Sequence, residues 1–244
     1  MIDPKFILDA FLAILPGIPR TLELGLISFA FGAAAAVPLA LCTMSVNPLW
    51  AWPARVYVIV FRGTPLLLQM FLIYYGLAQF DAFRQSFLWT FFRDPYFCAI
   101  LALTLNMAAY ASEAVRGGLL AVPAGQVEAA RACGMPPLVL ARRIVFPIAI
   151  RQCLPAFGNE LIIMLKSTSL ASIIAIMEVS GIAARIMAET YRIVETLIAA
   201  GAIYLAMAFV SARLVRTVEV WLSPQMARGK QVFAHDKTGD VLRA

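Results

Sequence analysis

The chain has 244 residues and a net charge of +6; 62% of its residues are hydrophobic, only 14% are charged, and the mean hydropathy is +0.83. Ordinary soluble domains carry about 25% charged residues, so the composition excludes that class and predicts helices that face lipid. The four cysteines form no C-x-x-C pair and there is a single histidine. These counts exclude a disulfide framework, a zinc site and a histidine-based triad, so we expect no metal and no cofactor.

Five apolar stretches have roughly the 20 residues that a helix needs to cross the hydrocarbon core. They are residues 24–44, 56–80, 95–112, 152–177 and 196–212. The second contains Arg62, and the fourth contains Glu160 and Lys166. The pattern predicts an all-α integral membrane protein with five transmembrane helices.

An odd number of spans places the two chain ends on opposite sides of the membrane. Twelve basic residues then fall on one side: Arg55, Arg116, Arg131, Arg142, Arg143, Arg151, Arg213, Arg216, Arg228, Lys230, Lys237 and Arg243. Six fall on the other: Lys5, Arg20, Arg84, Arg93, Arg185 and Arg192. The positive-inside rule puts the N-terminus outside and the C-terminus in the cytoplasm. Because the basic residues are divided among loops, we expect the lipid bilayer and no nucleic acid as a partner.

The loop between the third and fourth spans has strong helix signals. Pro123 suits a helix start, and Gly134 followed by Pro136 is a helix stop. A short helix is therefore expected over residues 126–133, and a second one from Pro137 to near Pro147. On local grounds alone, this loop is a capped surface segment that holds two spans at a fixed angle.

The spacing within this loop suggests a more specific role. Glu128-Ala129-Ala130 is followed after three residues by Gly134, after nine more by Ile144, and after two more by Pro147. This resembles the EAA loop of ABC importer permeases, with Phe146 in place of the usual leucine. The resemblance implies that the loop docks on a separate ATPase, and it assigns ATPase coupling to Glu128, Ala129, Ala130, Gly134, Ile144 and Pro147.

No G-x-x-x-x-G-K-[ST] nucleotide motif occurs, so ATP hydrolysis is expected in a partner chain and this chain is not expected to be an enzyme.

Three further segments narrow the resemblance, which covers about residues 15–225. They are residues 61–76 with the sequence Arg-Gly-Thr-Pro, residues 103–113, and residues 155–170 with Lys-Ser-Thr-Ser-Leu. Together they resemble polar amino acid permeases, close to the M-type subunit of histidine/lysine/arginine/ornithine and octopine or nopaline importers. This implies the type I importer fold and the bacterial inner membrane. It divides the chain into a periplasmic segment (1–20), a transmembrane domain (21–225, with its coupling loop at 117–150) and a cytoplasmic tail (226–244).

The same resemblance implies an assembly. Its members are an ABC ATPase dimer, a periplasmic substrate-binding protein and a second five-helix permease subunit, either a Q-type relative or an identical copy. The substrate is then a polar amino acid of the basic or opine type. Its identity is left open, because the binding protein does most of the selecting in such systems.

Polar residues inside the spans are candidates for the substrate pathway, since charges at this depth usually face a partner or a wet cavity. In the fourth span, Glu160 and Ser167 share one row of the helix, beside a row that contains Lys166. The candidates are Glu160, Lys166, Ser167, Thr168, Ser169, Asn106, Glu113 and Gln69. The alternative is that the charges only neutralise other helices, and that Asn106 and Glu113 form interhelical hydrogen bonds.

Arg62 precedes a Gly63-Thr64-Pro65 break in the second span. A break of this kind frees backbone groups that need partners, so a structural or gating role is expected for these four residues.

Two other functions compete with the importer. A carrier driven by an ion gradient would need inverted repeats with paired broken helices, which are not visible in the sequence. An intramembrane hydrolase would need a nucleophile with a base, and only Ser112 beside Glu113 offers one.

Overall fold

The computed structural model describes residues 3–222, and this part of the chain contains helices and no strands. The predicted tail at 226–244 lies outside the described residues. The α-helices are α1 (Pro4–Ile14), α2 (Ile18–Thr43), α3 (Pro48–Gly63), α4 (Leu66–Phe71), α5 (Asp81–Arg84), α6 (Trp89–Phe92), α7 (Pro95–Leu120), α8 (Ala124–Ala132), α9 (Pro137–Leu140), α10 (Phe146–Ser167), α11 (Val179–Thr190) and α12 (Ile193–Leu222). Short 3₁₀ turns (Leu15–Gly17, Leu77–Gln79, Thr168–Ile174) and π-helical turns (Leu72–Gly76, Ala141–Val145) join several of them.

Four helical stretches are long and apolar enough to cross a membrane. They are Pro4–Thr43, Pro95–Leu120, Pro137–Ile174 and Ile193–Trp221. A fifth crossing exists if the bent pair Pro48–Gly63 and Leu66–Gln79 counts as one span. An all-helical membrane protein is thus confirmed, with four or five candidate spans.

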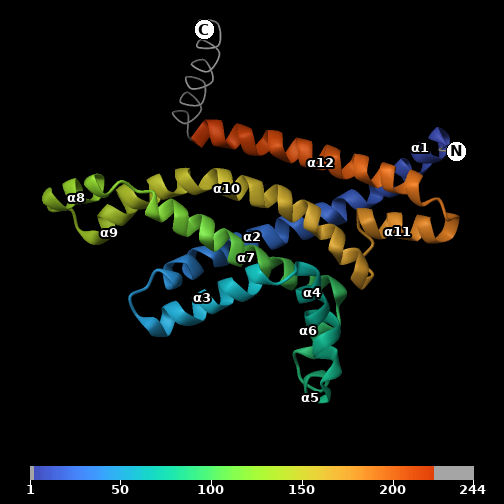
Figure 1. Cartoon of the computed structure of the whole chain (residues 1–244), viewed down its shortest axis with the longest axis horizontal. Coiled ribbons are helices and arrows are strands. Elements are labelled where there is room, and N and C mark those ends of the chain that lie inside the picture. Colours follow the sequence, from blue (N-terminus) through green and yellow to red (C-terminus); the bar gives the residue numbers. More distant parts are fainter. Residues whose placement is uncertain (1–2, 223–244) are drawn as a thin grey trace, which may run out of the picture.

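The long helices run along the longest axis of the molecule (Figure 1). The short helices α8 and α9 lie at one end, and α1 and α11 lie at the other. Helix α12 begins beside α11 and runs back toward the α8 end, while α5 and α6 project sideways from the bundle. The carboxylate of Asp3 caps α1 and accepts a hydrogen bond from Arg192 at 3.2 Å, which lowers the pKa of Asp3 and ties the start of α1 to the α11–α12 connection.

Two apolar clusters hold the helices together. The larger joins α2, α4, α7 and α10 and includes Leu24, Met70, Leu103, Met107 and Met164. The smaller joins α1, α11 and α12 at the right end of Figure 1, and it includes Ala10, Ile14, Val179, Ala183 and Ile203. The cytoplasmic or periplasmic position of each cluster follows from the orientation proposed below.

Glu178, which was not predicted as a functional residue, connects α2, α11 and α12. Its side chain is fully buried at the start of α11. The carboxylate accepts hydrogen bonds from the Tyr204 hydroxyl of α12 at 2.6 Å, the Thr21 hydroxyl of α2 at 3.2 Å and the Gly181 amide at 2.9 Å. One side chain therefore connects three helices, and the only sequence signal for it is an isolated acid after the apolar run 170–177.

Glycine allows α7 and α10 to approach closely. A Cβ on Gly118 would lie 2.7 Å from the Ala149 carbonyl oxygen of α10, whereas a Cβ on the adjacent Gly117 would meet nothing within 4 Å. Small residues at helix contacts are typical of membrane proteins, where packing replaces the hydrophobic effect as the driving force for helix association.

The second predicted span, 56–80, is broken: α3 and the stretch that begins with α4 meet at 107°. Thr64 is extended (φ −113°, ψ 146°) because the following residue is Pro65, and proline disfavours the helical conformation of the residue before it. The sequence predicted a break at this site, but the size of the bend is a finding of the structure.

Gln69 satisfies the backbone groups that the break leaves free. Its amide nitrogen donates to the carbonyl oxygens of Phe61 (2.9 Å) and Thr64 (3.1 Å) and contacts the Thr64 hydroxyl at 2.8 Å. Its amide oxygen accepts from Asn106 of α7 at 3.1 Å. Non-helical backbone at membrane depth needs such partners, so this buried amide fixes the end of α3 against α7.

The second short helix of the loop does not end near Pro147, contrary to the prediction. A π-helical turn, Ala141–Val145, carries α9 directly into α10, and Pro147 lies in the first turn of α10. Proline is tolerated in a first turn because its missing N–H has no required partner there.

We expect Gly118→Ala to destabilise the protein by about 1 to 3 kcal/mol, the usual cost of overpacking, because the new methyl group meets backbone rather than a movable side chain. Thermal unfolding of the detergent-solubilised protein measures this. Gly117→Ala is the matched control and should unfold at the wild-type temperature. Equal behaviour of the two variants would contradict the close approach of α7 and α10.

Gln69→Leu should lower stability by about 1 to 2 kcal/mol, since it removes several membrane hydrogen bonds worth roughly 0.6 kcal/mol each. Gln79→Leu is the control, because Gln79 is exposed and makes one long hydrogen bond, 3.4 Å, to the Tyr75 carbonyl oxygen. Proteolysis near the 64–65 bond should become faster only in the Gln69 variant. Unchanged stability and proteolysis would show that the break does not depend on this amide.

Candidate functional site

The motif loop forms helix α8, with Pro123 extended at its N-cap. The helix ends at Gly134, which has φ +72°, and the Met135 amide donates to the Ala130 carbonyl oxygen at 3.1 Å. A left-handed residue at this position is the common glycine helix stop. Glu128 and Ala129 are exposed, so this short helix presents a carboxylate and a small side chain at one end of the bundle.

A groove of about 450 Å³ separates α8 from the start of α10. Of the six coupling candidates, Ala129, Ala130 and Ile144 line it, together with Gln126, Cys133, Met135, Arg143 and Ile148. Glu128 and Gly134 are exposed beside this groove, and Pro147 lies in the first turn of α10. The residues of the motif are therefore one local unit that joins α8 to α10.

An outer cavity of about 550 Å³ lies between the end of α3, α7 and α10. It is lined by Arg62, Gly63, Thr64, Pro65, Leu66, Asn106, Tyr110, Glu160, Ile163 and Ser167. The structure thus brings together the four residues of the predicted break (62–65) and three of the predicted substrate-pathway residues, Asn106, Glu160 and Ser167. We call this set of residues the outer cavity because it lies farther from the α8 end of α7 than the second cavity does.

The remaining pathway candidates lie elsewhere. Lys166 is exposed and does not line the outer cavity. Thr168 is buried and its hydroxyl donates to the Leu165 carbonyl oxygen at 2.8 Å, while the Ser169 hydroxyl donates to the Lys166 carbonyl oxygen at 2.7 Å. Gln69 is buried behind the break. Of the two neighbouring rows on α10, the one with Glu160 and Ser167 faces the cavity.

An inner cavity of about 640 Å³ lies nearer the α8 end. Its lining is Thr43, Met44, Arg55, Val58, Ile59, Arg62, Glu113, Arg116 and Leu120. Glu113, predicted as a pathway residue, lines this cavity rather than the outer one. Arg62 lines both cavities.

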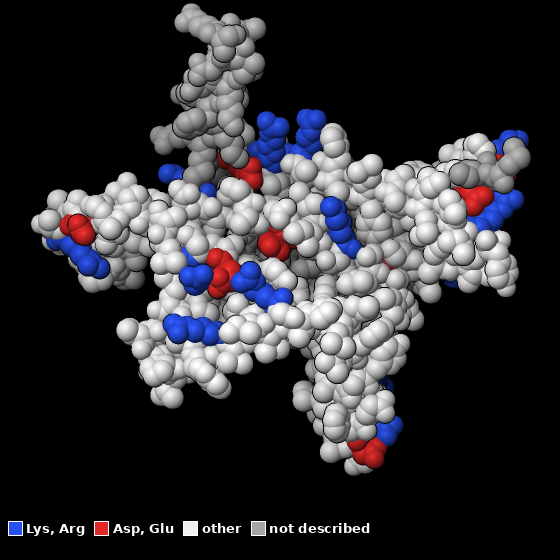
Figure 2. Space-filling model, viewed as in Figure 1, with Lys and Arg blue, Asp and Glu red and all other residues white. Residues whose placement is uncertain are grey.

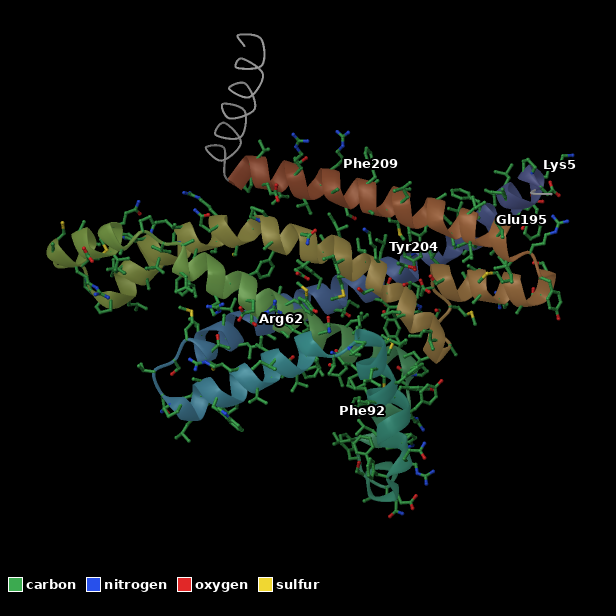
Figure 3. All side chains as sticks on the ribbon, in the orientation of Figure 1. Lys5, Arg62, Phe92, Glu195, Tyr204 and Phe209 are labelled. Carbon is green, nitrogen blue, oxygen red and sulfur yellow. The ribbon has the colours of Figure 1, made fainter. Side chains whose placement is uncertain are left out.

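Ionic contacts connect the walls of the inner cavity. Arg116 donates to Glu113 through Nε (3.1 Å) and Nη2 (2.8 Å), both on α7, and Arg62 of α3 lies 3.8 Å from Glu113 Oε2. The Arg62 guanidinium also lies over the Tyr110 ring, 5.3 Å from its centre. Figure 3 places Arg62 at the end of α3, where this helix meets α7.

Arg55 and Arg116 were not predicted as site residues, because the sequence analysis counted them only as signals of topology. Arg55 donates through Nε and Nη2 to the Thr43 carbonyl oxygen, both at 3.1 Å, and so caps the end of α2. Arg116 follows Glu113 by three residues, and this spacing on a helix predicts an ion pair. Figure 2 shows a mostly uncharged face on which acidic and basic side chains gather near the middle, over α3, α7 and α10.

Comparisons with known proteins identify the family of this chain. Residues 28–223 match the family model described as "Binding-protein-dependent transport system inner membrane component". The octopine transport system permease protein OccM of Rhizobium meliloti is 52% identical over 98% of this chain and 98% of its own length. The nopaline transport system permease protein NocM of Agrobacterium fabrum is 53% identical over 92% of this chain and 93% of its own.

A solved structure has the same fold. The crystal structure of an amino acid ABC transporter with histidines superposes on this chain with a TM-score of 0.80 and 33% sequence identity. The superposition covers 90% of this chain and 98% of the matched chain. Members of this family pair with ATPase and substrate-binding partners. The chain belongs to the binding-protein-dependent transport system inner membrane components and is the membrane permease component of an ABC amino acid importer, a multi-pass transport protein rather than an enzyme.

Proposed function

We propose that this chain forms half of a passage for a basic or opine-type amino acid, and that the outer cavity is the substrate site on its wall. The observation that carries the proposal is the convergence of Glu160, Asn106, Ser167 and Arg62 on one cavity of about 550 Å³. This volume lies within the range of small-molecule sites. Glu160 would attract the cationic end of the substrate, and Arg62 would meet its carboxylate.

The rest of the assembly is proposed from the family of the chain and from its candidate spans. The bent pair α3 and α4 counts as one span, which gives five spans, with the N-terminus outside and the C-terminus in the cytoplasm of a bacterial inner membrane. Helix α8 then reaches the cytoplasm and docks on one subunit of an ATPase dimer. A second five-helix subunit, a Q-type relative, closes the passage, and a periplasmic binding protein delivers the substrate. Family membership favours this ATP-driven transport over the ion-gradient-driven alternative.

The coupling role of α8 is supported by its exposed Ala129 and by the groove that joins it to α10. We expect Ala129→Trp to stop the ATPase from co-purifying with the permease, because a large ring at a small exposed position blocks close approach. Ala184→Trp, at an exposed position of α11 at the opposite end of the bundle, is the control and should retain the ATPase. Retention by both variants would contradict docking through α8.

The substrate role of Glu160 is tested by Glu160→Gln in proteoliposomes that contain the complete complex and binding protein. Uptake of labelled arginine or octopine should require ATP and the ATPase, and the variant should raise KM by roughly tenfold, the effect of losing about 1.4 kcal/mol. Glu189→Gln, at an exposed position on α11, should behave as wild type. Normal uptake by an assembled Glu160→Gln complex would remove this residue from the site.

A further inference from the structure

We propose that the inner cavity is a second amino acid site, which binds the carboxylate of the substrate on its way out of the outer cavity. The proposal rests on the proposed function, because it adds a second position to the same passage. Its ligand class is a zwitterionic or cationic amino acid with at least one free carboxylate.

The shape of the inner cavity allows such a ligand. Its volume, about 640 Å³, exceeds that of the outer cavity, and its walls come from the ends of α2 and α7 and from the middle of α3. Val58, Ile59 and Leu120 supply apolar surface beside the charged groups. Apolar walls with a few convergent polar groups are typical of small-molecule sites.

The charge of the inner cavity is unbalanced in a way that favours a carboxylate. Three guanidinium groups (Arg55, Arg62 and Arg116) face one carboxylate, Glu113. Arginine is well suited to binding carboxylates through two parallel hydrogen bonds, so the excess of guanidinium groups over carboxylates in this cavity favours a ligand with a carboxylate.

The hydrogen bonds indicate which guanidinium is available. Arg55 is engaged by the Thr43 carbonyl oxygen, and Arg116 by Glu113. Arg62 is 3.8 Å from Glu113, too far for a hydrogen bond, and its side chain donates no hydrogen bond to the described residues. Its side chain is 43% exposed. The five donors of this guanidinium are thus mostly free, at the boundary of the two cavities.

The position of Arg62 implies an order of events. A substrate whose cationic end is held by Glu160 in the outer cavity can place its carboxylate on Arg62. When the cationic end leaves Glu160, the carboxylate stays on Arg62 while the molecule turns into the inner cavity, where the Arg116–Glu113 pair lies within reach of its charged ends. Arg62 would then act as a pivot between the two positions.

A site at this end of the passage has a measurable consequence. Amino acid that accumulates on the cytoplasmic side should occupy the inner cavity and slow further uptake. This inhibition by internal substrate separates an inner site from a purely structural ion-pair cluster, which free amino acid would not affect.

The experiment uses the complete reconstituted complex with radiolabelled arginine and octopine as probes. Equilibrium binding to the wild-type complex should reveal one more site per copy of this chain than binding to Arg116→Gln. Internal probe should inhibit wild-type uptake, and this inhibition should need roughly tenfold more internal probe in Arg116→Gln, which corresponds to about 1.4 kcal/mol. Glu160→Gln should lose the outer site and keep the inhibition.

A second variant covers the case in which Arg116→Gln fails to assemble. Ile59→Trp keeps every charge and fills the inner cavity from its exposed apolar wall, so it too should lose one binding site per copy and the internal inhibition. The inner site would be overturned if the wild-type complex takes up the probe, binds it at a single site that Glu160→Gln abolishes, and shows no inhibition by internal probe. That result would leave the proposed function intact. If the complex takes up neither arginine nor octopine when ATP is supplied, both the proposed function and the inner site are contradicted. An anionic phospholipid that co-purifies with wild type but not with Ile59→Trp would make the cavity a lipid site and overturn the proposal.

Discussion

The hydrogen bonds between Gln69, the end of α3 and Asn106 are the constraint on which both cavities depend. Gln69 is almost fully buried and binds the backbone at the break, while Asn106 connects it to α7. These bonds fix the last turn of α3, and with it Arg62, at the boundary of the outer and inner cavities. In lipid, a bend of this size without such partners would leave backbone groups unsatisfied, which the hydrocarbon core disfavours.

The distribution of charge along the passage follows from this arrangement. Glu160 lies in the outer cavity with Arg62, and the carboxylate of Glu113 is bound by Arg116 in the inner cavity. In the proposed passage, a cationic group would therefore meet Glu160 in the outer cavity, and a carboxylate would meet Arg62 and Arg116 in the inner one. This asymmetry suits a zwitterion that turns as it moves, because opposite ends of the molecule are held at successive positions.

The parts of the fold and site that could be predicted from sequence are those fixed by local chemistry. The positions of α8 and of its glycine stop depend on Pro123 and Gly134 alone, and the break depends on Pro65. Which row of α10 faces the cavity depends instead on packing against α2 and α7, so the sequence grouped Lys166 with Glu160 although only Glu160 lines the cavity. The partners of Gln69 and Glu178 are similarly distant in sequence, and Arg116 was noted for its side of the membrane rather than for its neighbour Glu113.

The near-continuous helix from Pro4 to Thr43 carries a mechanical consequence. Forty residues at 1.5 Å each give a rod about 60 Å long, twice the roughly 30 Å depth of the hydrocarbon core. One end is clamped by α11 and α12, and the other ends at Thr43, whose carbonyl oxygen is held by Arg55. Between its two ends this helix packs against α7 and α10, so a tilt imposed at the end held by α11 and α12 would shift the Thr43 wall of the inner cavity together with these neighbours.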